Sequence, residues 1–375
     1  MNMRKILLLF CLCFLIGGKA MAQGATDDCF TFSEATLTPN GESVELIVGL
    51  NGSRLYTAYN LDITLPAGID VALNSKGNPR VSMIKGPNFY PNDEDEDNPT
   101  FSHSVSYSYG VVGSNILRVS CTSTMNESFL KTSGDLFKVY LIASPFAKPG
   151  KNTIKVSGCN LTAIEGGEVH KYVPADNQYE VLTIGNSSSL TLSINAANKF
   201  STCILPFDYT PSGFTAYTAD AVEDDFITLT EANTMSAYTP YIIYSETGYS
   251  GTASGTVDAS KYVATATAGI LTGAIEPQDI TDGYVLQNMD DGNGAMFYNV
   301  NGKKFRIPAG KCWIAGGAAS VKDFLGFNVE DASSINTVSS PTNDQTIYDL
   351  NGNQVSTCEA GRIYIINGKK VLKIK

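Results

Sequence analysis

Apolar and polar residues alternate over most of the chain, with the period of two that strands with one buried face show. In "FSHSVSYSYG" (101–110), alternate residues from Phe101 to Tyr109 fall on one face and the serines on the other. Gly, Pro, Asn and Asp punctuate these runs at short intervals, as turn residues do. No stretch carries an apolar period of 3.6 residues with helix caps. The pattern therefore predicts an all-β protein.

Runs of this kind in the first half of the chain predict an antiparallel β-sandwich, because several short strands with turn signals between them are typical of that architecture. They cover residues 29–38, 42–52, 56–66, 101–112, 115–124, 134–144 and 152–164.

A second set of runs follows the polar stretch "TIGNSSSL" (183–190) and predicts a second all-β domain. Turn signals at "DDGNG" (290–294) and Asn301-Gly302 separate its later strands. A polar linker then leads to a tail with a further Asn-Gly turn at 367–368. The expected organisation is a signal peptide at 1–22, a first sandwich at 23–185, a second all-β domain at 187–328, a linker at 329–345 and a C-terminal β-hairpin tail at 346–375.

The N-terminus has the three parts of a secretory signal peptide. Arg4 and Lys5 precede an unbroken apolar run of eleven residues, Ile6–Ile16, and Ala20-Met21-Ala22 forms a cleavage site before Gln23. A membrane-spanning helix needs about 20 apolar residues, so this run is too short to span, and no other run approaches that length. We expect cleavage between Ala22 and Gln23, export through the inner membrane, no transmembrane segment afterwards, and a secreted or outer cell-surface location.

Removal of the leader makes an acidic chain more acidic. The leader holds three of the 26 bases and none of the 37 acids, which leaves 23 bases and a net charge of about −14. Affinity for nucleic acid comes mostly from basic residues on phosphates, so nucleic acid is not an expected partner. Six cysteines remain after cleavage, without zinc spacing. They are interpreted as small buried hydrophobes, with a disulfide such as Cys203 to Cys312 as the alternative.

Three parts of the chain resemble known families. The tail, "IYDLNGNQV" (347–355) followed by "GRIYIINGKKVLKIK" (361–375), resembles a short form of the C-terminal sorting segment of proteins exported by type IX secretion. That resemblance implies export machinery as a partner and a Gram-negative envelope as the setting. The alternative is that the tail packs as hairpins at the edge of the preceding domain.

The first domain resembles the cohesin and carbohydrate-binding sandwich group through "AYNLDITLPAGIDV" (58–71) and "GDLFKVYLIASPFAKPGKNTIKVSGCNLTAIEG" (134–166). The resemblance implies a cohesin-like jelly roll that binds either a protein partner through a sheet face or a polysaccharide. The second domain resembles an all-β module common in exported proteins, which adds architecture and no function.

One acidic run raises the possibility of calcium. "PNDEDEDNP" (91–99) places Asp93, Asp95 and Asp97 at alternate positions, and bound Ca²⁺ would relieve the repulsion between their carboxylates. The run lacks the glycine that a calcium loop uses for its turn, so a solvated loop is the alternative. The expectation is no cofactor other than this possible calcium ion.

Catalytic motifs are absent from the sequence, so no catalytic residue is assigned. The mature chain has two histidines, His103 and His170, and no nucleophile elbow or metalloprotease motif. His103 lies in an alternating strand and is interpreted as a satisfied core residue. A glycoside-active enzyme stays an alternative, because such an enzyme needs only two suitably spaced carboxylates.

Aromatic side chains supply the candidate ligand-binding residues, since flat apolar rings stack on pyranose rings. Tyr107 and Tyr109 share a strand face, and Tyr90 flanks the acidic run. Packing in the core is the alternative for each. The sequence thus predicts a non-catalytic secreted or cell-surface recognition protein whose first domain binds polysaccharide or a protein partner. A structural or adhesive envelope component without glycan binding is the chief competitor.

Overall fold

Period-two patterning gives strands almost everywhere in the computed structural model. The structure describes residues 24–85, 89–91, 100–111, 115–223, 226–288, 295–316, 323–329, 347–349, 353–355, 363–366 and 369–372. Within these ranges a single 3₁₀ turn, η2 (Ala259–Lys261), is the only helical element. The expected all-β class is confirmed.

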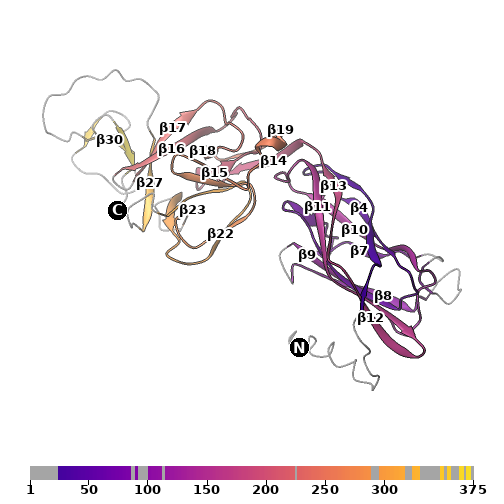
Figure 1. Cartoon of the computed structure of the whole chain (residues 1–375). Coiled ribbons are helices and arrows are strands. Elements are labelled where there is room, and N and C mark those ends of the chain that lie inside the picture. Colours follow the sequence, from indigo (N-terminus) through magenta and orange to yellow (C-terminus); the bar gives the residue numbers. More distant parts are fainter. Residues whose placement is uncertain are drawn as a thin grey trace. The chain divides into compact units, whose positions relative to one another are not determined.

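The chain forms two units (Figure 1). The first comprises Met1–Leu37, Gly41–Ala143 and Lys151–Ile184, and the second comprises Thr38–Asn40, Ser144–Gly150 and Gly185–Lys375. The signal peptide, its cleavage site at Ala22 and Gln23, the linker and the acidic run with Asp93, Asp95 and Asp97 lie outside the described residues.

The first unit contains two packed sheets. The larger has the order β1-β12-β11-β5-β9-β8, with β13 joining β11 to β3. The smaller has the order β2-β4-β10-β6, with β7 also on β10. The strands are β1 (Gly24–Thr26), β2 (Cys29–Phe32), β3 (Ala35–Leu37), β4 (Val44–Asn51), β5 (Ala58–Thr64), β6 (Ile69–Val71), β7 (Val81–Met83), β8 (His103–Tyr109), β9 (Ile116–Ser123), β10 (Ser133–Ala143), β11 (Gly150–Glu165), β12 (Glu168–Pro174) and β13 (Asn177–Ile184).

Alternation along the strands decides which residues enter the core between these sheets. On β5, Leu61 and Ile63 are fully buried, while Asn60 before them and Thr64 after them are half-buried. The ring of Tyr59 stacks on Phe137 of the other sheet, with ring centroids 6.1 Å apart. Its centroid lies 6.0 Å from that of Phe30, also on the other sheet, in an edge-on contact. Aromatic contacts of this kind join the two sheets into a sandwich.

The second unit is built on a ten-stranded sheet in the order β15-β18-β16-β17-β27-β24-β23-β26-β21-β20. The sheet curls, so that β15 lies near β21 and β26. Its strands are β15 (Phe200–Ile204), β16 (Thr215–Glu223), β17 (Phe226–Ala232), β18 (Pro240–Tyr244), β20 (Thr265–Ala268), β21 (Leu271–Ala274), β23 (Tyr284–Asn288), β24 (Ala295–Asn299), β26 (Cys312–Ile314) and β27 (Phe324–Val329); two small pairs add β14 (Ser187–Ile194) with β19 (Tyr249–Thr256) and β22 (Gln278–Ile280) with β25 (Phe305–Ile307).

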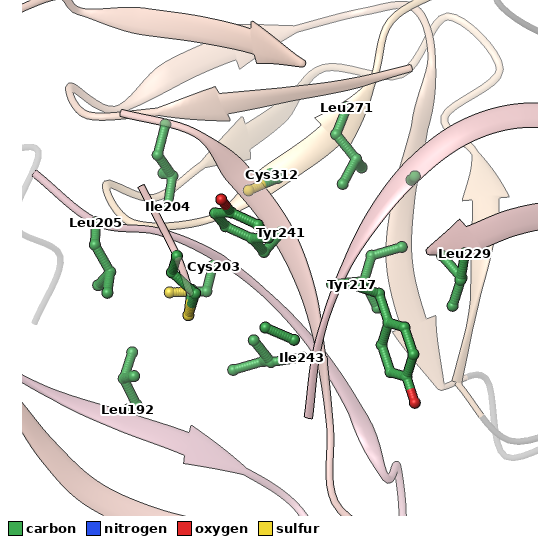
Figure 2. Packing of buried hydrophobic residues seen from close by; sticks show 14 of the residues in the cluster. Leu192, Cys203, Ile204, Leu205, Tyr217, Leu229, Tyr241, Ile243, Leu271 and Cys312 are labelled. Atoms are coloured by element: carbon green, nitrogen blue, oxygen red, sulfur yellow. The ribbon is translucent and has the colours of Figure 1, made fainter. Parts of the chain in front are cut away.

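Cysteines serve as small apolar residues in these cores. Figure 2 shows Cys203 and Cys312 among the aliphatic and aromatic side chains inside the second unit. Both are free thiols, and burial raises the pKa of Cys203 to about 12. The structure therefore contradicts the alternative of a Cys203–Cys312 disulfide. Cys121 and Cys159 are buried and free in the same way, and Cys29 is free and half-buried.

The tail forms a separate small sheet in the order β29-β28-β30-β31. Its strands are β28 (Ile347–Asp349), β29 (Gln354–Val355), β30 (Ile363–Ile366) and β31 (Lys369–Leu372). The tail groups with the second unit, in which β31 lies beside β27. The hairpins expected from the sequence are present, and their role as a sorting signal stays a prediction.

Candidate functional site: the hydroxyl face of the first unit

The outward face of the larger sheet carries short polar side chains. Directly opposed residues of neighbouring antiparallel strands point to the same side, and here Asn60 opposes Ser120, which opposes Ser106. On β5 and β9 the residues that alternate with them, such as Leu61, Ile63, Leu117 and Val119, are buried. We call this surface the hydroxyl face. Its polar residues are Asn60, Thr64, Ser104, Ser106, Ser108, Ser120, Thr122, Ser157, Asn160 and Thr162, with Asp62 and Arg118 at its centre; Ala58, Ile116 and the exposed Lys155 lie on the same side.

The central pair fixes one cation in a defined position. Arg118 donates from Nε to Oδ1 of Asp62 and from Nη2 to Oδ2, both at 2.7 Å. The hydrogen bonds from this fork raise the pKa of Arg118. The Arg118 side chain keeps 50% of its surface exposed, whereas Asp62 keeps 12%. Asp62 thus holds the guanidinium in place, and the exposed part of the guanidinium can contact a ligand.

A bulge on β11 shapes the neighbouring part of the hydroxyl face. The pairing with β5 shifts between Ser157 and Asn160, so β11 holds one extra residue there. Gly158 occupies the left-handed region with φ of 61°, which glycine adopts without strain. Its carbonyl accepts a hydrogen bond from Nδ2 of Asn60 at 2.8 Å. The bulge therefore holds the Asn60 amide on the face.

The hydroxyl face has the dimensions of a protein-binding surface. Strands lie about 4.8 Å apart and rise about 3.4 Å per residue, so four strands of about seven residues span roughly 19 Å by 24 Å. A standard interface buries about 800 Å² on each partner, the same order of magnitude.

The three candidate tyrosines have different surroundings. Tyr90 is fully buried, and its hydroxyl donates to the carbonyl of Leu136 at 3.0 Å. It is a core residue and presents no face to a sugar, because its ring packs against Phe129 and His103. Tyr107 is 38% exposed, and Tyr109 is half-buried, with its hydroxyl donating to Oδ1 of Asp70 at 2.6 Å.

Tyr107 and Tyr109 lie together on β8, on the side of the sheet opposite to the hydroxyl face. They oppose Val119 and Leu117 of β9, both of which point into the sandwich. Among the aromatics that the structure describes in the first unit, Tyr107 alone is counted as exposed. A single ring is not a row, so the stacking platform of many sugar-binding modules is not formed by the described residues.

Within the described residues no three His, Cys, Asp or Glu side chains gather in a way that could hold a metal ion, and none of the helices is long and apolar enough to cross a membrane. A cavity of about 240 Å³ in the second unit is lined by residues including Phe200, Phe305 and Lys311. It is smaller than the ~300–1,000 Å³ usual for small-molecule sites, and a second cavity of about 320 Å³, lined by residues including Phe146, Leu190 and Lys311, lies at the low end of that range.

Comparison with known proteins gives structural likeness only. Neither a protein-family model nor a curated protein sequence matches this chain. A non-cellulosomal cohesin from the archaeon Archaeoglobus fulgidus is similar over 42% of this chain and 91% of its own, at 14% identity and a TM-score of 0.26. A cohesin–dockerin complex from Clostridium thermocellum matches over 40% of this chain and 100% of the matched chain, at 16% identity and a TM-score of 0.24.

A type II cohesin dyad from an adaptor scaffoldin of Acetivibrio cellulolyticus matches a larger part of the chain. It covers 75% of this chain and 95% of its own, at 12% identity and a TM-score of 0.26. The description of the first unit as a sandwich rests on its own strand pairing and burial, and so does the geometry of the hydroxyl face.

Proposed function

We propose that this chain is a recognition protein that binds a protein partner on the hydroxyl face of its first unit. The observation that supports this proposal most is the anchored Arg118 in the middle of a flat field of hydroxyl and amide groups. Arginine is over-represented among the residues that dominate binding energy at protein interfaces, and it is most effective near the centre of the contact.

The composition of the hydroxyl face keeps the cost of binding low. Ordering a long, flexible side chain at an interface costs about 0.5–1.5 kcal/mol, while Ser, Thr and Asn have few rotamers to lose. Arg118 is already held by Asp62, so most of its ordering precedes binding. Serine and asparagine also supply adaptable hydrogen bonds in paratopes. A partner with complementary polar groups and a carboxylate over Arg118 fits this surface.

Polysaccharide is the less supported ligand. Sugar-binding surfaces use exposed aromatic rings, and the hydroxyl face has none among its described residues. Tyr107 is on the other side of the same sheet. The proposed recognition role is non-catalytic. The competing functions are a structural component of the envelope and a glycoside-active enzyme.

The proposed location is the cell exterior. The leader at 1–22 favours export, and the tail at 346–375 favours handling by an envelope sorting system. A surface partner protein is then available to the first unit.

Site-directed photo-crosslinking in the producing cells tests the proposal. A photoreactive residue at Ser120 or Thr162, both on the hydroxyl face, is expected to give a specific adduct with another protein. Arg118→Glu is expected to abolish it, because a negative charge replaces the central cation. The matched control is the same photoreactive residue at Ile142, which is exposed on the smaller sheet.

Mass spectrometry of the adduct separates a foreign partner from a second copy of this chain. No adduct from the hydroxyl face, or equal adducts from Ile142, contradicts the proposal. Binding of the mature chain to a panel of polysaccharides, with calcium and with EDTA, tests the competing ligand. Sugar binding that survives Arg118→Glu and is lost in Tyr107→Ala would move the site to the other side of the sheet.

A further inference from the structure

β8 (His103–Tyr109) forms one edge of the larger sheet. β8 is the last strand in the order of that sheet, and of the described residues only β9 pairs with it. The pairing is regular over its whole length, from His103 opposite Ser123 to Tyr109 opposite Leu117, without a bulge. Among the described residues, this seven-residue strand thus has one side without a paired strand.

The bonds at the two ends of β8 show which backbone groups are unpaired. Gly110 N donates to Ile116 O at 3.2 Å, and Thr124 N donates to Ser102 O at 2.9 Å. In an antiparallel ladder such bonds recur at every second residue. The even-numbered residues therefore bond to β9, and Val105, Tyr107 and Tyr109 direct their N–H and C=O groups to the open side.

Nothing in the strand protects this edge. Natural edge strands are guarded by lysine, proline, bulges or inward-pointing charges, because a bare edge pairs with other chains. The sequence of β8, HSVSYSY, has no proline, lysine or acid, although the chain contains 63 Asp, Glu, Lys and Arg residues. Its serines and tyrosines make it a good β-former without repulsion.

We infer that β8 is a self-association strand, which pairs antiparallel with β8 of a second copy around a two-fold axis at Ser106. This register aligns all seven residues of one strand with all seven of the other. Val105 then exchanges backbone hydrogen bonds with Tyr107 of the second copy, and Tyr107 with Val105 of the second copy. The groups that point to the open side are the ones this register uses.

Side chains match in the same register. On the inward side each Tyr107 ring faces Val105 of the second copy, and aromatic with β-branched cross-strand pairs are favourable. On the hydroxyl face Ser106 meets Ser106, and Ser104 meets Ser108. No like charges oppose each other. Pairing also covers Tyr107, which is otherwise 38% exposed. An isologous contact of this type closes as a dimer.

Sedimentation of the mature chain tests this inference. Wild type is expected to shift from monomer to dimer as its concentration rises. Ser106→Lys is expected to stay monomeric at every concentration, because two ammonium groups would meet on the axis. Ser106 is exposed, so this variant keeps its fold. The matched control is Thr122→Lys, which adds the same charge to the same face on β9 and is expected to dimerise like wild type.

Engineered cysteines test the register. Non-hydrogen-bonded antiparallel pairs have Cα atoms about 4.5 Å apart, within the range of a disulfide. Ser106→Cys is expected to give a covalent dimer on mild oxidation, above the background of wild type treated in parallel. Ser104→Cys alone is expected to give none, whereas Ser104→Cys mixed with Ser108→Cys is expected to crosslink.

A wild-type chain that is monomeric at all concentrations overturns the inference and leaves the open edge to a different protein. A dimer that Ser106→Lys does not weaken, or that Ser106→Cys does not trap, also overturns it, because the contact then lies elsewhere.

Discussion

His103 is held as a neutral side chain by its contacts in the first unit. Nε2–H donates to the carbonyl of Thr57 at 3.1 Å, which leaves Nδ1 to accept from the Ser102 hydroxyl at 2.9 Å. The ring packs against Phe129 with centroids 4.9 Å apart. Burial lowers the pKa of His103, against the opposing influence of the Thr57 carbonyl and the Glu127 carboxylate. The interpretation of His103 as a satisfied core residue is confirmed.

The stability of the first unit should therefore depend on pH through His103. The folded pKa lies below the unfolded value of 6.5, so the unfolded chain takes up the proton first as the pH falls. The full contribution of neutral His103 is present above about pH 6.5 and is lost as the pH falls toward the folded pKa, at up to about 1.4 kcal/mol per pH unit.

Calorimetry between neutral pH and about pH 5 measures this slope in wild type, His103→Gln and His170→Gln. We expect the dependence of stability on pH to flatten in His103→Gln. The matched control is His170→Gln, at a half-buried position on β12, and we expect the dependence to persist there. Equal slopes in all three proteins would mean that His103 does not carry the pH dependence.

Strands with clear alternation were predictable one by one, and their partners were not. The expected run 115–124 contains β9, and the run 101–112 contains β8. The short strands β6 and β7 have only three residues each, too few for a period of two to emerge. The parallel pairings of β1 with β12 and of β3 with β13 join segments far apart in the chain, which local patterning does not encode.

The candidate site was predictable only in part, for the same reason. Tyr90 sits in a polar stretch of sequence and was assigned to the ligand, yet residues from distant segments, Phe129 and His103, enclose its ring. The face-sharing of Tyr107 and Tyr109 was correct, because it follows from alternation within one strand. The pairing of Asp62 with Arg118 was not predicted, since it depends on the register of β5 with β9.

The bulge in β11 gives a prediction at the scale of the element. Gly158→Ala places a Cβ about 3.5 Å from Asp62 Oδ2, an ordinary contact, so the cost comes from φ of 61°. A left-handed alanine costs about 1–2 kcal/mol, which lowers the Tm of a domain of this size by roughly 2–8 °C. Gly24→Ala has open space and no left-handed φ, so we expect its Tm to equal that of wild type. An unchanged Tm in Gly158→Ala would show that the bulge can relax at no cost.

At the scale of the whole molecule, the two ends of the chain are the parts that bear on its location. After the proposed cleavage the net charge would be about −14, which repels other acidic surfaces, so binding would depend on local matches such as Arg118 and the uncharged β8 edge. The hydroxyl face needs the protein to be outside the cell, because its proposed partner is a surface protein. Export is thus the premise on which the proposed function rests.

Fractionation of producing cells tests that premise. The extracellular or surface-bound protein is expected to begin at Gln23 in intact mass measurement, and Ala22→Arg is expected to block cleavage, because the site requires a small residue. Deletion of 346–375 is expected to leave cleavage intact and to retain the protein in the periplasm. The deletion removes only the small tail sheet, so the pairing of β5, β8 and β9 is unaffected. If the shortened chain reaches the exterior as efficiently as wild type, the tail is an edge of the second unit and not a sorting signal.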